Sequence, residues 1–225
     1  MKALVKNKPE PGAIYQEMPS PVPGDTDLLV KIKATALCKS DVDVVEWTTL
    51  VASSDLPLPL IMGHEFLGEV IDKGKLVKNF KIGDHVTGET HIPCGYCYPC
   101  RNGHSHICSN NMGVLGRNVH GSFAEYIRIP EVAAIKVDKG LPPAQGSLLE
   151  PLATALHALT KSNISGETVL VLGCGAIGLM AVELAKILGA TKVFAVDIFQ
   201  NKLDAALKFG ADVVINGREH DLVEV

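Results

Sequence analysis

The sequence predicts a chain of mixed class, in which a β-rich part is followed by a parallel α/β unit. Two observations support this prediction. Short apolar and β-branched segments, separated by Gly and Pro, fill roughly the first 150 residues. After Gly146 the pattern changes to apolar runs that alternate with segments of helical spacing. The 225 residues, 47% of them hydrophobic, allow about one to two domains.

The strands predicted for the first part lie at residues 28–33, 66–71, 81–86 and 123–129. A loop rich in Pro, from Pro19 to Gly24, precedes the first of them. Gly68 lies inside the second, where it indicates a bend or a close approach of backbone. Short strands separated by such turns are typical of a partly open β-barrel.

The second part predicts a helix over residues 146–161 and then a βαβαβ unit. Residues 168–172 form an unbroken apolar run, which is typical of a strand buried on both faces of a parallel sheet. Helices over 177–188 and 200–209 each end at a Gly, and strands are predicted at 192–196 and 212–215. This order is one half of a doubly wound sheet. We therefore predict domains at 1–150 and 151–225, and we expect the second domain to be truncated.

Charge and hydropathy exclude several classes of protein. The net charge is −4, and the basic residues are scattered, so neither nucleic acid nor an anionic membrane is an expected partner. The longest charge-free apolar stretch, from Thr168 to Val182, is too short and too rich in Gly to span a bilayer. The N-terminus lacks the apolar core of a signal peptide. We expect a cytoplasmic protein.

A glycine-rich motif predicts a dinucleotide site. Gly173, Gly175 and Gly178 fit G-x-G-x-x-G between a predicted strand and a predicted helix, where they allow a tight turn, close approach of a pyrophosphate and close packing. Asp197 ends the next strand, where a carboxylate can accept hydrogen bonds from ribose hydroxyls. No Arg lies in residues 198–202, so the motif favours NAD over NADP. The alternative is a turn with incidental glycines.

Four cysteines predict a structural zinc site. Cys94, Cys97, Cys100 and Cys108 can close around one tetrahedral Zn²⁺ and leave no open position. The alternatives are free thiols, a redox pair or an iron–sulfur cluster.

A second possible metal site is dispersed along the chain. A thiolate at Cys38, an imidazole at His64 and carboxylates at Glu65 and Glu150 suit a catalytic Zn²⁺ with an open position. From composition alone, each of these residues also has an ordinary interpretation, as a buried thiol, a core histidine or a charge at a helix start.

Taken together, these motifs resemble the zinc-dependent medium-chain dehydrogenase/reductase family across essentially the whole chain. The resemblance implies a GroES-like catalytic domain followed by a Rossmann domain. It implies a catalytic zinc held by Cys38, His64 and either Glu65 or Glu150, and hydride transfer from a secondary alcohol to NAD. It also implies that Ser40 carries the alcohol proton away and that the full-length family form is a homo-oligomer. The motifs that carry it are Gly63-His64-Glu65, Cys38-x-Ser40-Asp41, the four cysteines, Gly121–Tyr126, Glu150-Pro151 and Gly173–Gly178.

The substrate stays open between L-threonine and a polyol such as sorbitol or butanediol. Glu150 stands where other branches of the family have Cys, and in this respect the chain resembles the threonine and polyol dehydrogenases. Two residues depart from the family pattern, because Asp43 stands where a His is common and Lys39 where a Gly is usual. Residues 151–155 resemble the polyol branch more closely. A different alternative is that the 225 residues bind zinc but are catalytically inactive on their own.

Overall fold

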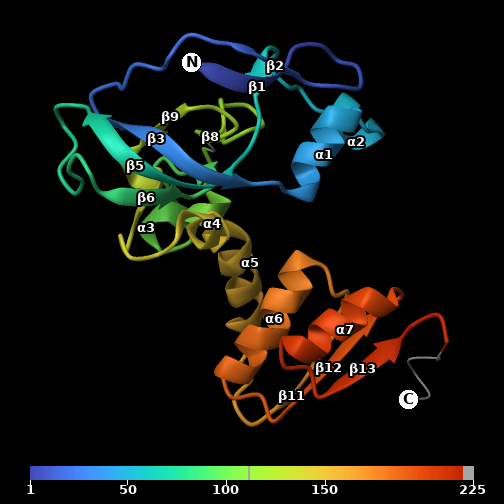
Figure 1. Cartoon of the computed structure of the whole chain (residues 1–225). Coiled ribbons are helices and arrows are strands. Elements are labelled where there is room, and N and C mark those ends of the chain that lie inside the picture. Colours follow the sequence, from blue (N-terminus) through green and yellow to red (C-terminus); the bar gives the residue numbers. More distant parts are fainter. Residues whose placement is uncertain (111, 220–225) are drawn as a thin grey trace. The chain divides into compact units, whose positions relative to one another are not determined.

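The computed structural model describes residues 1–110 and 112–219, and the chain divides into two units, Met1–Glu150 and Pro151–Val225 (Figure 1). Strands dominate the first unit, and strands alternate with helices in the second. This order is the mixed fold class that the sequence predicts. No helix among the described residues is long and apolar enough to cross a membrane.

The strands of the first unit pair in antiparallel fashion and form separate sheets. One sheet has the order β2-β1-β4, a larger one has the order β10-β6-β5-β3-β9, and β7 pairs with β8. The larger sheet ends at β10 on one side and β9 on the other, so it remains open rather than closing into a barrel. The strands are β1 (Lys2–Lys6), β2 (Ile14–Glu17), β3 (Asp27–Ala36), β4 (Leu60–Ile61), β5 (Glu65–Lys73), β6 (His85–Gly88), β7 (His91–Ile92), β8 (Gly113–Val114), β9 (Tyr126–Pro130) and β10 (Ala134–Val137).

Short helices connect these strands. The helix α1 follows β3 directly and ends at Trp47, whose φ of 53° lies in the left-handed region. These helices are α1 (Lys39–Glu46), α2 (Thr49–Ala52), α3 (Tyr98–Arg101) and α4 (Pro143–Gly146), with 3₁₀ turns at Ser105–Ile107 and Glu131–Ala133. The next helix, α5 (Leu149–Leu159), begins at the end of the first unit and continues into the second.

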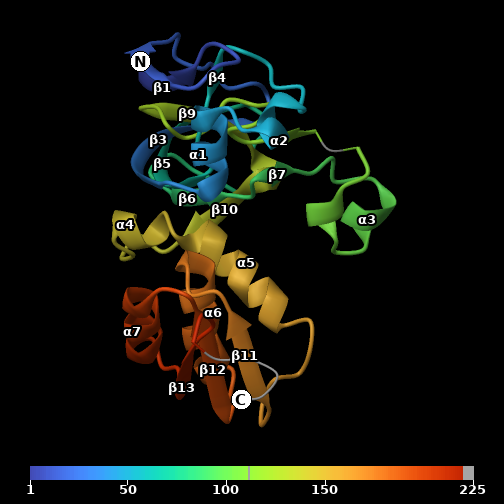
Figure 2. The same cartoon turned by 90° about the vertical axis from the view of Figure 1, so that its right-hand side faces the viewer.

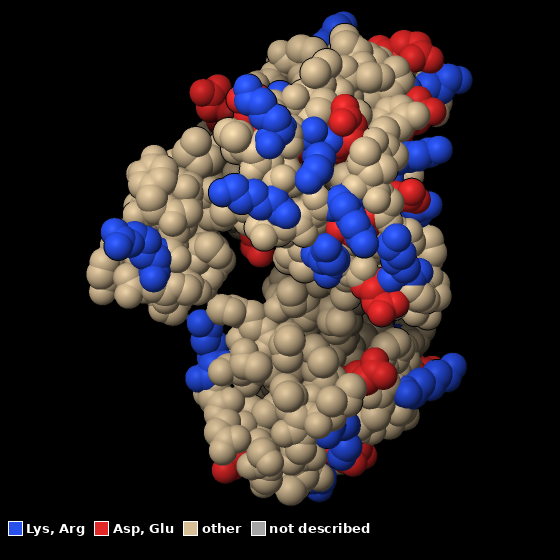
Figure 3. All heavy atoms as spheres, turned by 90° about the vertical axis from the view of Figure 1, so that its left-hand side faces the viewer, with Lys and Arg blue, Asp and Glu red and all other residues tan. Residues whose placement is uncertain are grey.

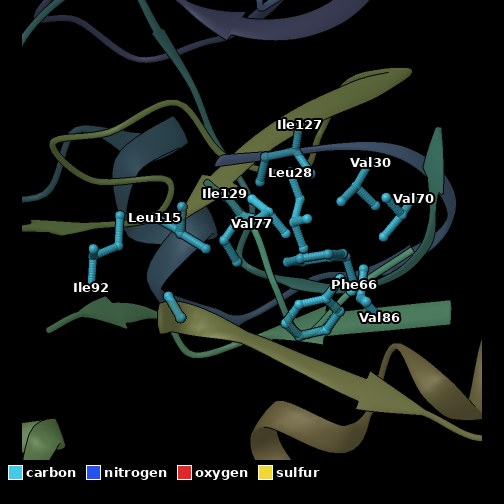
Figure 4. Packing of buried hydrophobic residues seen from close by; sticks show 12 residues of the cluster. Leu28, Val30, Phe66, Val70, Val77, Val86, Ile92, Leu115, Ile127 and Ile129 are labelled. Carbon is cyan, nitrogen blue, oxygen red and sulfur yellow. The ribbon is translucent and has the colours of Figure 1, made fainter. Parts of the chain in front are cut away.

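The core of the first unit lies against the larger sheet (Figure 4). Phe66 is fully buried and packs among aliphatic side chains from β3, β5, β6 and β9. A Cβ at Gly88 would lie 2.4 Å from Ile129 Cδ1 and 3.2 Å from the Phe66 ring, so this position leaves room for nothing larger than Gly. The buried cluster comprises Leu28, Val30, Phe66, Val70, Val77, Phe80, Val86, Ile92, Leu115, Ile127, Ile129 and Ala133.

A buried lysine ties the N-terminal strand to α1. Lys6 has none of its surface exposed, and its ammonium donates to the carbonyl oxygens of Glu10, Gly12 (3.0 Å) and Val45 (3.1 Å). The same ammonium lies 5.1 Å from the centre of the Trp47 ring. Burial lowers the pKa of Lys6, and Glu10 raises it. Three carbonyl acceptors and an aromatic face offset the desolvation of the charge.

The second unit contains a parallel sheet of order β11-β12-β13. Val182, Ala185, Val193 and Leu203 lie in its buried cluster, which joins the helices to the sheet. The elements are β11 (Thr168–Leu172), α6 (Ala176–Ile187), β12 (Lys192–Asp197), α7 (Gln200–Lys208) and β13 (Val213–Asn216). The predicted βαβαβ order is confirmed.

The prediction that residues 168–172 are buried on both faces is wrong within the described residues. Val169 and Val171 pack against the buried cluster, but Leu170 and Leu172 are 57% and 68% exposed. Successive side chains of a strand point to opposite faces, so one face of β11 packs on the buried cluster and the face with Leu170 and Leu172 is left uncovered by the described residues. An apolar run in the sequence does not show whether one or both faces of the strand are covered by other elements.

Two other predicted elements have different bounds. Of the strand predicted at residues 81–86, residues 81–84 form a turn, with Gly83 at a φ of 85°, and β6 begins at His85. The predicted helix over 146–161 divides into α4 and α5, because the helical pattern is interrupted at Ser147.

Candidate functional site

The first candidate site brings together Cys38, His64 and Glu65. One ligand atom from each residue lies within 4.8 Å of the other two. His64 and Glu65 are buried, at 6% and 5% exposure, and Cys38 is half-buried. A thiolate, an imidazole and a carboxylate at this separation form a donor set that fits one Zn²⁺.

The pairing of β3 with β5 explains why these residues meet. Ala36, the last residue of β3, is paired with Glu65, the first residue of β5. Cys38 therefore lies just beyond the end of one strand, and His64 lies just before the start of its antiparallel partner. Thr35 Oγ1 donates to the Glu65 carbonyl oxygen at 2.8 Å, which fixes this edge of the pair.

Asp41 connects the two segments that carry the candidate ligands. Its carboxylate accepts from the backbone N–H of Cys38 (3.0 Å) and from that of Gly63 (3.1 Å). One of its oxygens lies 3.7 Å from His64 Nδ1. At 2% exposure, Asp41 is a buried carboxylate that fixes the backbone beside Cys38 and His64 and places a negative charge near the imidazole. Asp41 belongs to the motif Cys38-x-Ser40-Asp41, but the sequence alone does not predict a role for it in the site. Its position three residues after a candidate thiol ligand was the only indication of such a role.

Three glycines hold the turn before His64 against a neighbouring loop. A Cβ at Gly63 would lie 2.3 Å from the Phe123 ring, and Gly63 has a φ of 88°. A Cβ at Gly121 would lie 1.9 Å from the Gly63 carbonyl oxygen, and one at Gly116 would lie 2.8 Å from it. Ser122 N–H donates to that same oxygen at 2.9 Å. This close backbone packing restricts where His64 can lie.

Glu150 lies close to this group but outside the set within 4.8 Å. Its Oε1 accepts from Thr90 Oγ1 at 2.9 Å. Burial raises the pKa of the Glu65 carboxyl, Glu150 and Asp41 raise it further, and His64 and Cys38 lower it. Two neighbouring carboxyl groups disfavour each other's charge, and a divalent cation would relieve that repulsion.

The two positions that depart from the family pattern contact each other. Lys39 and Asp43 form an ion pair across one turn of α1, with side chains that are 73% and 25% exposed. The hydrogen bond from this pair raises the pKa of Lys39. Ser40 is half-buried in the same turn of α1, two residues after Cys38.

The second candidate site is the cysteine lobe, residues 94–110, which projects from the strands of its unit (Figure 2). The sulfur atoms of Cys94, Cys97, Cys100 and Cys108 all lie within 4.8 Å of one another. A tetrahedral zinc with Zn–S bonds of about 2.3 Å places its sulfurs roughly 3.8 Å apart. Cys97 Sγ and Cys108 Sγ lie 3.8 Å apart. The four sulfur donors are therefore close enough together to hold one zinc ion.

Backbone donors favour thiolates in this lobe. Cys94 N–H donates to Cys108 Sγ and Cys97 N–H donates to Cys94 Sγ, both at 3.3 Å. The backbone N–H of Cys100 is the main cause that lowers the pKa of Cys97 to about 6, while burial raises the pKa of Cys100 to about 12. All the residues from 94 to 110 are described, and none of them is buried. The lobe has no hydrophobic core of its own, so a bound metal would supply its stability.

The third candidate site is the glycine-rich turn between β11 and α6. Gly173 has a φ of 94°, which allows the tight turn. A Cβ at Gly178 would lie 1.8 Å from the Gly173 carbonyl oxygen, so only Gly lets α6 pack here. A Cβ at Gly175, the N-cap of α6, would meet nothing within 4 Å. Each glycine has the environment that a pyrophosphate-binding turn requires.

Asp197, at the end of β12, holds this turn in place. One carboxylate oxygen accepts from Cys174 N–H at 2.9 Å, and the other accepts from the N–H groups of Ile198 (2.8 Å) and Phe199 (3.0 Å). Burial opposes the charged form of Asp197, but these donors and the Lys202 ammonium hold its pKa below the usual range.

Lys and Arg side chains predominate on the face seen in Figure 3, with Asp and Glu side chains among them. The net charge of the chain is −4.

Comparisons with known proteins match both units. Residues 24–139 match the alcohol dehydrogenase GroES-like domain, and residues 176–225 match zinc-binding dehydrogenases. The L-threonine 3-dehydrogenase of Pseudoalteromonas translucida is 42% identical over 225 residues, which are 100% of this chain and 65% of that protein.

Two solved structures are similar over nearly the whole chain. A zinc-binding dehydrogenase from Sinorhizobium meliloti 1021 bound to NADP has a TM-score of 0.90 at 33% identity, covering 99% of this chain and 64% of that one. Galactitol-1-phosphate dehydrogenase from Escherichia coli has a TM-score of 0.90 at 30% identity, covering 100% of this chain and 63% of that one. The chain thus spans about two thirds of the length of these proteins.

Proposed function

Because the chain belongs to the zinc-binding alcohol dehydrogenases with a GroES-like domain, we propose that it acts as an NAD-dependent dehydrogenase of a secondary alcohol. The observation that carries this proposal is the convergence of Cys38, His64 and Glu65 within 4.8 Å. The match of the second unit to zinc-binding dehydrogenases supports it.

In this proposal Cys38, His64 and Glu65 hold a catalytic zinc, and Glu150 is an alternative carboxylate ligand. A bound zinc would act as a Lewis acid that lowers the pKa of the alcohol, and the nicotinamide of NAD would accept the hydride. The Asp41 carboxylate lies 3.7 Å from Nδ1 of His64, which would favour use of the other ring nitrogen for the metal. Thr90 Oγ1 donates to Oε1 of Glu150 and so helps to position this alternative carboxylate ligand.

Ser40 is proposed to take the alcohol proton at its hydroxyl oxygen, because it lies in the same helical turn as Cys38. Asp43, three residues after Ser40 on that helix, is proposed as a further proton acceptor, and it forms an ion pair with Lys39. The carboxylate of Asp43 and the ammonium of Lys39 would together select for the polar groups of the substrate.

We propose that Cys94, Cys97, Cys100 and Cys108 hold a second, structural zinc. Four sulfur donors fill the coordination of the metal, which leaves no position for substrate. This zinc would order the lobe and take no part in the reaction.

The turn formed by Gly173, Gly175 and Gly178 is proposed to bind the pyrophosphate of NAD, with Asp197 accepting from the adenosine ribose. The open space at Gly175 supports this proposal. The Sinorhizobium meliloti structure that is bound to NADP is 33% identical to this chain, which supports a nicotinamide dinucleotide as the cofactor.

For the substrate we propose L-threonine first and a polyol second. The 42% identity to an L-threonine 3-dehydrogenase supports the former, and the similarity to galactitol-1-phosphate dehydrogenase supports the latter. We further propose that the full-length form is a homo-oligomer in the cytoplasm, where its cysteines would remain reduced.

The test combines elemental analysis with NADH formation from L-threonine, sorbitol and butanediol. Cys38→Ser should lose one bound zinc and all turnover, whereas Cys174→Ser, a change of the same kind outside both cysteine sites, should keep both zinc ions. A chain that releases no zinc on Cys38→Ser would contradict the proposal. If zinc binds as expected but no alcohol is oxidised, the alternative applies, in which these 225 residues bind zinc without turnover on their own.

A further inference from the structure

The first unit contains a cavity of about 320 Å³ that none of the candidate sites uses. A volume of this size lies at the lower end of the range for small-molecule sites, roughly 300–1,000 Å³. None of the candidate metal ligands described above is among its lining residues. Its walls come from segments far apart in the sequence, namely Met1, residues 18–21 after β2, Ile61 of β4, residues 119–121 and residues 126–128 of β9.

Backbone hydrogen bonds hold these walls together. Met18 N–H donates to the Met1 carbonyl oxygen, and the Met1 ammonium donates to that of Met18, both at 2.8 Å. Gly121 N–H donates to the Ile61 carbonyl oxygen at 2.8 Å, and Ile61 N–H donates to His120 Nδ1 at 3.2 Å. The cavity is therefore formed by the fold itself, so a ligand does not have to order its walls in order to bind.

Apolar side chains form most of the lining. Ile61 and Ile127 are each 2% exposed, so they belong to the packed interior. Met1 and Met18 are half-buried, and the flexible thioether chain of Met adapts to the shape of what it contacts. These walls favour a ligand with an apolar body, because the transfer of apolar surface out of water is favourable.

The charged groups at the cavity favour a negative charge on that ligand. Arg128 contributes a guanidinium with five N–H donors, and its Nε lies 3.5 Å from the Asp27 carboxylate. The other end of the guanidinium can hold a second carboxylate. The Met1 ammonium, the other cation of the lining, lies 3.4 Å from the carboxylate of Glu17, which is 72% exposed. Among the described residues that line the cavity, none is Asp or Glu.

His120 supplies a second donor in the same lining as Arg128. Burial lowers the pKa of His120, and Arg128 lowers it further, so the imidazole is neutral near pH 7. Since its Nδ1 accepts from Ile61 N–H, the proton of the neutral ring is on Nε2. The ring therefore has one N–H group to donate.

We propose that this cavity binds a small monocarboxylic acid with an apolar body, whose carboxylate accepts from the Arg128 guanidinium and the His120 imidazole. The apolar walls at Ile61 and Ile127 then contact the body of the ligand. An amide of the same shape lacks the charge-assisted hydrogen bonds, and an amine would carry the same charge as Arg128. The site is separate from the proposed dehydrogenase centre, so this inference does not rest on the proposed function.

The test is an NMR titration of the full chain, labelled with ¹³C at the methyl groups of its five methionines. The probes are phenylacetate and the neutral phenylacetamide, which has nearly the same shape. Met1 and Met18 line the cavity, whereas Met112 and Met180 do not. We expect saturable shifts of the Met1 and Met18 signals with the acid, and binding of the amide that is at least about tenfold weaker.

Three variants locate the binding. Arg128→Gln should weaken the acid roughly tenfold to a hundredfold and leave the amide almost unchanged. Arg101→Gln removes an exposed Arg on α3, outside the lining, and as the matched control it should change neither probe. Ser20→Trp places a large ring at an exposed position of the lining, so it should abolish binding while the Met112 and Met180 signals stay in place.

Cys38→Ser separates this site from the first candidate metal site, where a carboxylate could also bind. The shifts of Met1 and Met18 should be unchanged in this variant, and their loss would overturn the inference. Shifts that do not saturate, equal affinities of acid and amide, or binding that survives Ser20→Trp would each overturn it as well. All of these outcomes leave the proposed function as it stands.

Discussion

Replacing Asp41 by Asn tests how the first candidate metal site is held together. The carboxylate accepts two backbone N–H groups in a position that is 2% exposed. The amide of Asn keeps one acceptor oxygen and presents an NH₂ group in place of the other. One backbone donor, on Cys38 or on Gly63, then loses its partner in a buried environment. Leaving such a donor unsatisfied costs about 1–3 kcal/mol.

The bond that is lost was made to a charged acceptor, so we expect the free energy of unfolding to fall by about 2–3 kcal/mol. For a unit of this size the unfolding midpoint should fall by roughly 5–10 °C. The His64 imidazole also loses its negatively charged neighbour at 3.7 Å. Loss of such a partner of a metal-bound His typically weakens metal binding about 10- to 100-fold.

Two measurements separate these effects. Thermal unfolding of the metal-free protein reports the lost hydrogen bond, and competition with a chelator reports the zinc affinity of the Cys38 site. Asp43→Asn is the matched control on the same helix, since it breaks an ion pair with a largely exposed lysine. It should cost about 0.5 kcal/mol or less. A metal-free Asp41→Asn protein that unfolds at the wild-type midpoint would refute the reasoning.

Three further predictions concern other parts of the chain. Cys100→Ser should release one zinc ion and increase the hydrogen exchange of residues 94–110, while the exchange of β5 stays unchanged; an unchanged zinc content contradicts the structural site. Gly178→Ala should destabilise the second unit by about 1–3 kcal/mol, because its Cβ would lie 1.8 Å from a carbonyl oxygen. Gly175→Ala should unfold like the wild type but bind the nucleotide more weakly, and equal unfolding midpoints of the two variants would contradict this. Asp84 has a pKa held low chiefly by the hydrogen bond from the Lys136 ammonium, so its contribution to stability is present above an unfolded pKa of about 3.9 and is lost as the pH falls below that value. Acid titration of unfolding should show a smaller decrease in stability for Asp84→Asn than for the wild type.

Residue spacing in the sequence could predict only those candidate sites whose residues lie close together along the chain. The sulfur atoms of Cys94 and Cys108 meet because the chain between them is short, and Gly173 and Gly178 are neighbours across a single turn. By contrast, Cys38 and His64 meet through the register of β3 and β5. Periodicity gives no register between strands far apart in sequence, so a resemblance to a family was needed to group them.

Other features required coordinates. Strands of two residues, such as β4 and β7, are too short to have a pattern of their own. Asp41 is assigned a role only when its two backbone donors are located. Arg218 lies near Phe199 because β13 runs parallel to β12, a contact across 19 positions that no local window detects.

The reactivity of the buried Lys6 can be used to measure local opening of the first unit. An amine-reactive reagent can reach that nitrogen only after three carbonyl contacts break and the end of α1 separates from β1. Lys8, whose side chain is 73% exposed, is available at all times and serves as the internal reference. The ratio of acylation at these two lysines, followed by mass spectrometry, therefore measures how often this helix detaches under native conditions. Since α1 also carries Asp41, the same ratio reports how often the imidazole of His64 is left without its support.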